Sequence, residues 1–284
     1  MKVIGYGDSV VDRYINKGIM YPGGNCLNFA VYAARLGMES SYLGVFGDDK
    51  EGRFIMGALD QMNVDYSQCR IEPGSVTERC DVSITEAGNR VFEGDDEREN
   101  LSDIYELEEK DLEYLREFDL IHCSCFAEEE TEIPKLSGML GIVAYDFSEE
   151  EEFRTDEYLD RICPYIDFAL FSCESMDEGA CEAFAKKIEF FGVRYILLTR
   201  GPYGQIFYDG KDFYRGSAVL IEAVDTMGAG DSFFTAFLVK LLVSGWTKNI
   251  PPEKSSIREA LDFAARFAAE NCLTEGAFGY GRKF

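Results

Sequence analysis

Apolar and polar positions along the chain follow two alternating patterns. Short apolar runs bounded by polar or glycine residues are typical of buried strands, and longer runs with apolar residues three and four apart are typical of helices. The strand-like runs are 2–6, 41–46, 120–125, 141–146, 168–172 and 195–199. The helical runs are 26–36, 52–62, 177–191, 231–244 and about 255–272. This alternation predicts an α/β fold with a mostly parallel sheet covered by helices.

A different pattern separates the second helical run from residue 101. Segments 77–85 and 90–93 alternate apolar and polar residues as strands do, and the turn-like residues 86–89 lie between them. The pattern predicts an antiparallel flap, with a plain surface hairpin as the alternative. In a parallel sheet, ligands bind beyond the carboxyl ends of the strands. Asp12, Asp146, Thr199 and Asp231 are expected at that edge.

Composition limits the kind of protein. With 284 residues, of which 46% are hydrophobic, the chain is long enough for a full core, and we expect one domain over 1–284. Its formal net charge of −25 disfavours nucleic acid or an anionic membrane as a partner. The acidic runs 128–130 and 149–152 are expected to be solvated surface.

The number and spacing of the cysteines indicate the cellular compartment of the protein. There are nine, an odd number without regular spacing, which is typical of reduced thiols in a cytoplasmic protein. The chain opens directly on a strand-like run without a signal-peptide pattern, and no apolar run approaches the roughly 20 residues that span a bilayer. We therefore expect a cytoplasmic protein.

The segment 225–231 carries the most specific chemistry. It reads Asp-Thr-Met-Gly-Ala-Gly-Asp and leads into a helical run. Gly228, Ala229 and Gly230 have small side chains or none, so their backbone N–H groups can approach an anion where the helix dipole also favours negative charge. Asp231 is placed to accept a proton from an attacking hydroxyl. The segment indicates phosphoryl transfer, and an ordinary Asp cap after a glycine turn is the alternative.

Other chemistries find little support. A Ser-His-Asp triad would need His122, the one histidine, which lies in a strand-like run and is expected to be structural. Cys123 and Cys125 have no second Cys or His pair spaced to complete a zinc site. Val10 stands where a dinucleotide fingerprint has its third glycine, and no G-x-x-x-x-G-K-[ST] loop is present.

Four segments together resemble one family. In chain order they are 23–28, 47–52, 199–204 and 225–231, and their order is similar to that of the PfkB/ribokinase carbohydrate kinases over nearly the whole length. The resemblance implies a ribokinase-like three-layer sandwich with a mostly parallel central sheet. It also implies a small β lid, formed by segments of about 9–21 and 75–100, that covers the sugar and excludes water.

The resemblance assigns a sugar site. Asp12, Gly23, Gly24 and Asn28 are expected to hold sugar hydroxyls, and Asp12 can accept two hydrogen bonds from a vicinal diol. Arg90 is expected either to close over a phosphate or substrate carboxylate, or to form a surface ion pair.

A nucleotide site is implied in the same way. Thr199, Gly201 and Gly204 are expected near the ATP phosphates, where small residues let backbone amides approach. Many family members have an Asn-Glu-x-Glu motif that organises Mg²⁺, but residues 172–175 here read Ser-Cys-Glu-Ser. Glu174 is therefore the candidate metal carboxylate, offset by one residue. Mg²⁺ is expected with ATP, and a monovalent cation is left open.

Shorter strings point to a substrate. Residues 7–12, 89–92 and 145–148, and Met227 in the 225–231 segment, are similar to the bacterial fructoselysine 6-kinases. The resemblance implies an ATP-dependent kinase of the 6-hydroxyl of fructoselysine or a related fructosamine. Asn25 replaces the lysine that many ribokinases have, which disfavours ribose. The alternatives are a kinase of fructose, 2-keto-3-deoxygluconate or another small sugar, and a non-catalytic sugar- or nucleotide-binding regulator. A homodimer through the lid is left open.

Overall fold

The computed structural model describes all residues except 86–89 and 97–104. Its largest element is an eight-stranded sheet. In spatial order the strands are β14 (Phe213–Gly216), β13 (Gln205–Tyr208), β12 (Tyr195–Thr199), β11 (Phe168–Ser172), β10 (Ile142–Asp146), β9 (Leu120–Ser124), β1 (Lys2–Tyr6) and β4 (Glu39–Leu43). Strands β4 to β12 in this order run parallel, and β13 and β14 are antiparallel additions at one edge.

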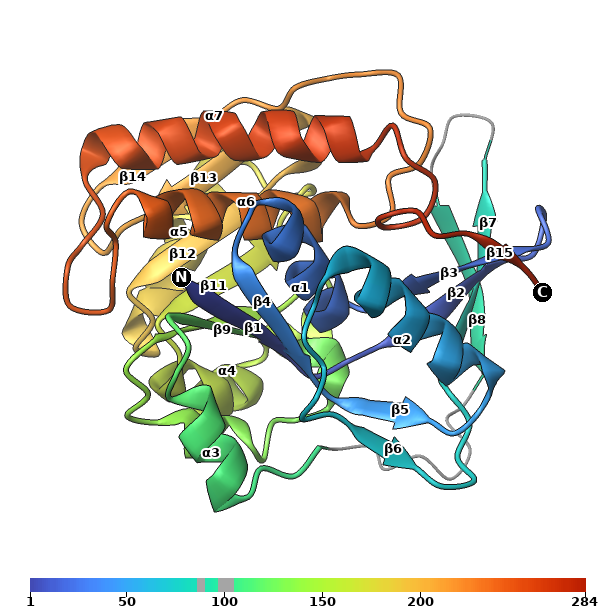
Figure 1. Ribbon diagram of the computed structural model, residues 1–284. Coiled ribbons are helices and arrows are strands. Elements are labelled where there is room, and N and C mark those ends of the chain that lie inside the picture. Colours follow the sequence, from blue (N-terminus) through green and yellow to red (C-terminus); the bar gives the residue numbers. More distant parts are fainter. Residues whose placement is uncertain (86–89, 97–104) are drawn as a thin grey trace.

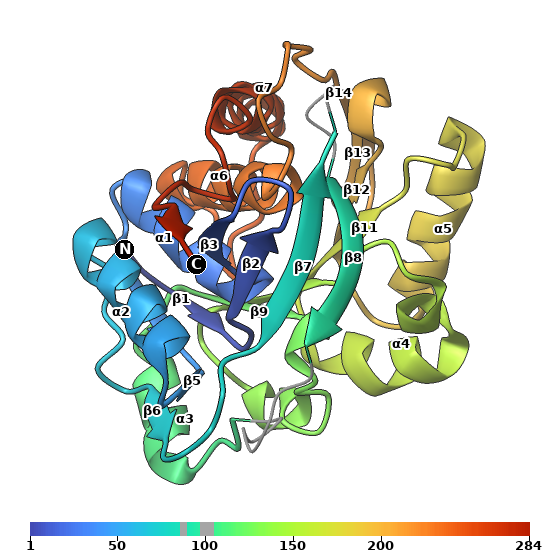
Figure 2. The ribbon, with the colours of Figure 1, turned by 90° about the vertical axis from the view of Figure 1, so that its right-hand side faces the viewer.

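Helices cover both faces of this sheet (Figures 1 and 2). One face packs on α1 (Asn25–Arg35), α6 (Ala229–Val243) and α7 (Lys254–Asn271). The other packs on α3 (Glu109–Leu115), α4 (Asp156–Ile162) and α5 (Glu178–Phe190). The result is the expected three-layer arrangement, and the aromatic side chains Phe233, Phe234 and Phe237 of α6 are buried in it.

The central strands are mostly apolar because they are buried on both faces, and the polar residues of β9 and β10 are His122, Ser124 and Asp146. All five residues of β9 and all five of β10 are buried. A parallel sheet covered by helices on both sides requires such continuous runs.

The predicted strand 41–46 is wrong in one respect. The chain leaves the main sheet after β4, and β5 (Val45–Gly47) pairs instead with β6 (Arg70–Glu72). Gly44 makes the break, where a Cβ would crowd the backbone oxygen of Gly7.

A second sheet of five strands lies to one side of the sandwich, at the right of Figure 1. Its order is β15 (Arg282–Lys283), β3 (Ile19–Gly23), β2 (Val10–Tyr14), β7 (Arg79–Ile84) and β8 (Arg90–Asp96). The predicted antiparallel pairing of the flap is confirmed for β7 and β8, and its turn, 86–89, lies outside the described residues. The sequence pattern did not predict β3 or β15.

Helix α2 (Lys50–Met62) joins β5 to β6. Its N-cap is Asp49, whose Oδ1 accepts a hydrogen bond from the Gly52 N–H at 2.8 Å. The same carboxylate also accepts bonds from Thr77, in the segment that leads into β7. One side chain thus caps the helix and fixes the entry to the small sheet.

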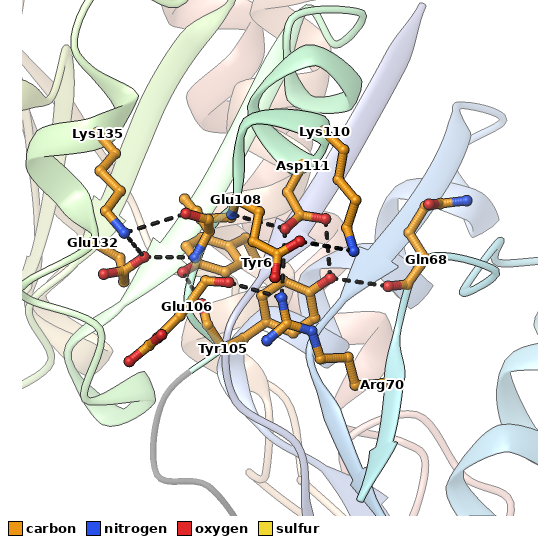
Figure 3. A network of polar contacts seen from close by, with 11 residues as sticks. Tyr6, Gln68, Arg70, Tyr105, Glu106, Glu108, Lys110, Asp111, Glu132 and Lys135 are labelled. Atoms are coloured by element: carbon orange, nitrogen blue, oxygen red, sulfur yellow. Dashed lines mark hydrogen bonds and ion pairs between the residues drawn. The ribbon is translucent and has the colours of Figure 1, made fainter.

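A polar network anchors the chain where it enters α3 (Figure 3). Tyr105 donates from its hydroxyl to Asp111 Oδ1 at 3.2 Å, and Arg70 lies 4.0 Å over its ring. The backbone oxygen of Tyr105 accepts a hydrogen bond of 2.7 Å from the hydroxyl of Tyr6, the last residue of β1. Tyr105 is thereby held at the end of a central strand, two residues before Asp8.

His122 is buried in β9, which confirms its predicted structural position. Its ring stacks on Phe29 with centroids 4.7 Å apart and meets Phe234 edge to face. Nδ1 is buried without a hydrogen-bond partner in the described part of the chain. Burial lowers the pKa of His122 to about 3, so the folded protein keeps this imidazole neutral where the unfolded chain protonates it.

This difference makes His122 a source of acid sensitivity. As the pH falls below about 6.5, the unfolded chain gains a proton that the folded state does not bind, so stability is lost between that value and about 3. At pH 5 the loss is about 2 kcal/mol. We expect His122→Phe, which keeps an aromatic ring, to be less destabilised by acid. Its stability should fall between pH 7.5 and pH 5 by about 2 kcal/mol less than that of the wild type. Urea unfolding of both proteins near pH 7.5 and pH 5 measures it, and identical pH dependence in the two would contradict it.

Candidate active site

The carboxyl ends of the parallel strands form the floor of the site. The register aligns Asp146 at the end of β10 with Ser124 at the end of β9. On the next two strands of the sheet, Ser172 at the end of β11 aligns with Thr199 at the end of β12. Thr199 donates to Ser172 from its hydroxyl at 3.4 Å. Residues far apart in the sequence therefore share one edge of the sheet, as expected for a ligand site.

The N-terminus of α1 faces this edge. Gly24 is its N-cap with φ of 109°, a conformation that favours glycine. It has no side chain to cap the helix, and Asp8, from the loop after β1, takes that role. The two carboxylate oxygens of Asp8 accept bonds from the N–H groups of Asn25, at 2.5 Å, and Cys26, at 3.2 Å. The helix dipole also stabilises a carboxylate here.

Asn28 links α1 to the start of α6. Its side-chain Nδ2 donates to Asp231 Oδ2 at 2.6 Å. Asn28 is buried and Asp231 half-buried, and the Oδ1 of Asn28 has no hydrogen-bond partner in the described part of the chain. The contact brings together two residues that are 203 positions apart and fixes the orientation of the candidate base.

The small residues before Asp231 have different roles. Gly228 is the N-cap of α6 with φ of 71°, and a Cβ there would overlap the hydroxyl of Tyr32. At Gly230, by contrast, a Cβ would meet nothing within 4 Å. Gly228 is therefore required by the turn and its packing, whereas the space beside Gly230, at the positive end of the helix, is open to a ligand.

Asp225 holds this turn in place. It is fully buried and accepts three hydrogen bonds, from the Met227 N–H at 2.9 Å, the Gly276 N–H at 2.8 Å and the Tyr14 hydroxyl at 2.7 Å. Tyr14 belongs to β2, and burial followed by this hydrogen bond raises the pKa of its phenol far above the usual range. One carboxylate thus joins the glycine turn, the loop after α7 and the small sheet.

Two of the residues expected to hold the sugar, Asp12 and Gly23, belong to strands of the small sheet. Asp12 in β2 is buried, and a Cβ at Gly23 in β3 would overlap its carboxylate. Because β3 ends at Gly23 and α1 begins at Asn25, this pair is brought next to the helix that carries Asn28. Arg90 begins β8, but its side chain lies outside the described residues.

The residues expected to bind the nucleotide gather beside Thr199. Gly201 has φ of 51°, and a Cβ there would lie 2.7 Å from Glu174 Oε2, so the two residues are in contact. Glu174 is exposed and follows β11. Gly204 has φ of 87°, and a Cβ there would overlap the backbone oxygen of Gly216. Packing against β14 is thus sufficient to require glycine at position 204.

Asp146 is a carboxyl group of the site with a strongly raised pKa. It is buried, its Oδ1 accepts a bond from the Ser148 N–H at 2.8 Å, and its Oδ2 accepts one from Asn25 Nδ2 at 3.3 Å. Burial raises the pKa of Asp146 to about 8, and the charge of Asp231 is the next cause. Asp146 and Asp231 therefore lie close enough to influence one another.

Sequence reasoning left several of these residues without a role. Asp8 and Asp225 are predicted only as parts of motifs, Asn25 only as the replacement of a ribokinase lysine, and Asp146 only by the sheet edge and the 145–148 string. Asp8, Asn25 and Asp146 lie at or within two residues of the end of a predicted element, which is the sequence signal that marks them, whereas Asp225 lies six residues before the predicted helix 231–244. The prediction for the acidic run 128–130 is wrong in part, because Glu129 is buried and its Oε2 would lie 3.3 Å from a Cβ at Gly7.

Comparison with known proteins agrees with this geometry. The family model described as pfkB family carbohydrate kinase matches residues 1–137 and 162–279. The chain belongs to the PfkB family. It is an ATP-dependent carbohydrate kinase, as the sequence predicted. In the described part of the chain, the helices are all too short or too polar to cross a membrane.

Two relatives are similar over nearly the full length of this kinase. It is 38% identical to fructosamine kinase FrlD of Bacillus subtilis, over 99% of this chain and 94% of the relative. It is 32% identical to fructoselysine 6-kinase of Escherichia coli, over 96% and 97% of the two chains.

A solved structure shows the fold. Fructokinase of Vibrio cholerae, in a form bound to fructose, ADP and calcium, superposes with a TM-score of 0.78 at 23% identity, covering 98% of this chain and 94% of that one. The predicted ribokinase-like fold is confirmed.

Proposed function

We propose that this kinase transfers the γ-phosphate of ATP to the 6-hydroxyl of a fructosamine, with fructoselysine as the first candidate. The observation that carries the substrate class is 38% identity, over nearly the whole chain, to a protein named a fructosamine kinase. A second relative is named for fructoselysine and for position 6. Specificity resides in particular side chains rather than in the fold, so the fold similarity to a fructokinase adds nothing to this choice.

In the proposed reaction, Asp231 accepts the proton of the 6-hydroxyl as its oxygen attacks the γ-phosphorus. Asn28 orients the carboxylate through its 2.6 Å hydrogen bond. The backbone N–H groups of Gly228, Ala229 and Gly230 stabilise the charge on the transferring group at the positive end of α6. The open space beside Gly230 supports this assignment.

The remaining contacts hold the two substrates. Asp12, Gly23, Gly24 and Asn28 are proposed to bind sugar hydroxyls. The Oδ1 of buried Asn28 has no hydrogen-bond partner among the residues that the structure describes, which supports its part, because such an oxygen is suited to accept a hydroxyl hydrogen bond. Thr199, Gly201 and Gly204 are proposed to border the ATP phosphates, at the end of β12.

We propose Mg²⁺ as the accompanying cation. Glu174 fits it, because its exposed carboxylate offers the oxygen ligands that Mg²⁺ prefers and lies against Gly201 in the proposed phosphate loop. When bound with ATP, Mg²⁺ neutralises charge on the phosphates. Turnover with Mg²⁺ omitted, and with K⁺ added or left out, tests both the divalent and a monovalent requirement. Full activity with a chelator present would contradict the first.

The small sheet is proposed to act as the lid and as a dimer contact. One of its two edge strands is β8, on which Val91 is 45% and Phe92 57% exposed. An apolar edge strand of this kind is commonly covered by a partner. A monomer in light scattering at working concentration would contradict the dimer.

A cytoplasmic location is also proposed, supported by nine free cysteines, and a chain recovered with the secreted fraction would contradict it.

The test of the function is ADP release with Mg²⁺-ATP and, in turn, fructoselysine, fructose, ribose, 2-keto-3-deoxygluconate and no sugar. We expect the highest kcat/KM with fructoselysine, and phosphorus NMR of the product should place the phosphate on the 6-hydroxyl. A higher kcat/KM with another sugar would keep the reaction and discard the substrate. Ligand binding without turnover of any sugar would favour a regulator.

A further inference from the structure

Asp146 is a buried carboxyl group at the site that the phosphoryl-transfer chemistry leaves without a role. It ends β10 and is 4% exposed. Its two oxygens accept hydrogen bonds from neutral donors, the Ser148 N–H and the Asn25 side chain. The bond from Asn25 is long, at 3.3 Å. In the part of the chain that the structure describes, no lysine, arginine or histidine forms an ion pair with Asp146.

Its surroundings are negative. Asp231, Asp8 and Glu150 each act on the ionisation of Asp146 in the direction that disfavours its charge. Buried carboxylates are normally paired with a cation or kept neutral, because an uncompensated charge is costly away from water. With its pKa raised to about 8, Asp146 is mostly protonated near neutral pH in the empty site, and a cationic group that enters favours loss of this proton, which a neutral group does not do.

The other carboxylates of the site already have partners or tasks. Both oxygens of Asp8 accept N–H groups at the start of α1. Asp12 lies against Gly23 in the small sheet, and Asp231 is the proposed base. Among these carboxyl groups, Asp146 is the one that neither caps a helix, nor packs in the small sheet, nor acts as the proposed base.

The substrate proposed above supplies a suitable cation. A fructosamine differs from the parent ketose in the amine attached to its first carbon, which is protonated near neutral pH. Discrimination between the two sugars therefore depends on what that nitrogen meets. A carboxylate forms a charge-assisted hydrogen bond with an ammonium group, whereas an ether or hydroxyl oxygen at the same position carries no such charge.

The first turn of α1 relates this carboxyl to the base. Asn25 contacts Asp146 and Asn28 contacts Asp231. Residues three apart on a helix lie side by side, about 5–6 Å apart at Cβ. A ketofuranose lying across this turn has its sixth carbon at Asp231 and its first carbon toward Asp146. We propose that Asp146 is a specificity-determining residue that binds the protonated amine of the substrate. This inference rests on the proposed function.

The test is a cycle of two proteins and two substrates. The substrates are fructoselysine and an ether analogue in which oxygen replaces the amine nitrogen, and the proteins are the wild type and Asp146→Asn. The wild type should prefer the amine by about 10- to 100-fold in kcat/KM, the usual range for a hydrogen bond to a charged group. Asp146→Asn should lose most of this preference, mainly through KM, with little change toward the ether.

A matched control is Glu149→Gln, which removes one negative charge from an exposed position three residues away. It should keep the wild-type preference. Equal losses toward both substrates in Asp146→Asn would overturn the inference and point to a role in shared chemistry, such as a metal ion, which a shifted Mg²⁺ dependence would reveal. If Asp146→Asn does not fold, wild-type indifference between amine and ether overturns the inference by itself. Wild-type protein without turnover of fructoselysine would overturn the proposed function, and this inference with it.

Discussion

Asp231→Asn is expected to lower kcat by at least about 10²-fold and up to about 10⁴-fold, the range that a general base contributes. The amide cannot accept the proton of the attacking hydroxyl, yet it has nearly the shape of the carboxylate. Its oxygen can still accept the hydrogen bond from Asn28 that orients position 231. Steady-state ADP release with saturating sugar and Mg²⁺-ATP measures the effect. The KM values should change much less, because the contacts proposed for the sugar and ATP remain.

The matched control is Asp262→Asn, the same exchange at an exposed position of α7. It should leave kcat within about twofold, since a surface substitution seldom alters a distant site. Both variants should unfold at the wild-type urea concentration. Turnover of Asp231→Asn close to that of Asp262→Asn would rule out Asp231 as the base and require another group to take the proton.

The larger part of the fold follows from the sequence because burial dictates it. Strands such as β9 and β10 are covered on both faces, so most of their residues are apolar and the pattern shows them clearly. Several short strands were not predicted, among them β6, β13, β14 and β15. β15 has two residues, both exposed, and exists only by pairing with β3. Pairing between distant segments leaves little local pattern.

In the candidate site too, features that arise locally could be predicted from the sequence, and contacts between distant residues could not. Gly228, Gly230 and Asp231 could be predicted as candidate site residues because a glycine turn before a helix is a local feature with a local physical meaning. The link from Asn28 to Asp231 joins residues 203 positions apart. The place of Asp146 depends on the register of β10 with β9 and on Asn25 from α1. Such relations arise only when the sheet assembles, so the sequence could indicate the reaction more readily than the surroundings of each group.

Asp225→Ala is expected to lower the free energy of unfolding by about 3–5 kcal/mol. The change leaves three buried donors, from Tyr14, Met227 and Gly276, without their acceptor, and each loss costs about 1–3 kcal/mol before water enters the space. Because the same carboxylate fixes the turn at Gly228, kcat should also fall. Urea unfolding followed by circular dichroism measures the stability, provided that the slope of the transition is unchanged.

Tyr14→Phe is the matched control, since it removes one of the three donors and keeps the ring in its packing. It should cost about 1 kcal/mol, the usual net worth of one hydrogen bond, and it leaves the Met227 and Gly276 contacts to Asp225 in place. The difference between the two variants then reports how much the backbone donors contribute to holding the glycine turn against the loop after α7. If Asp225→Ala costs no more than Tyr14→Phe, the turn is held by its own backbone and Asp225 is not what positions the proposed anion hole.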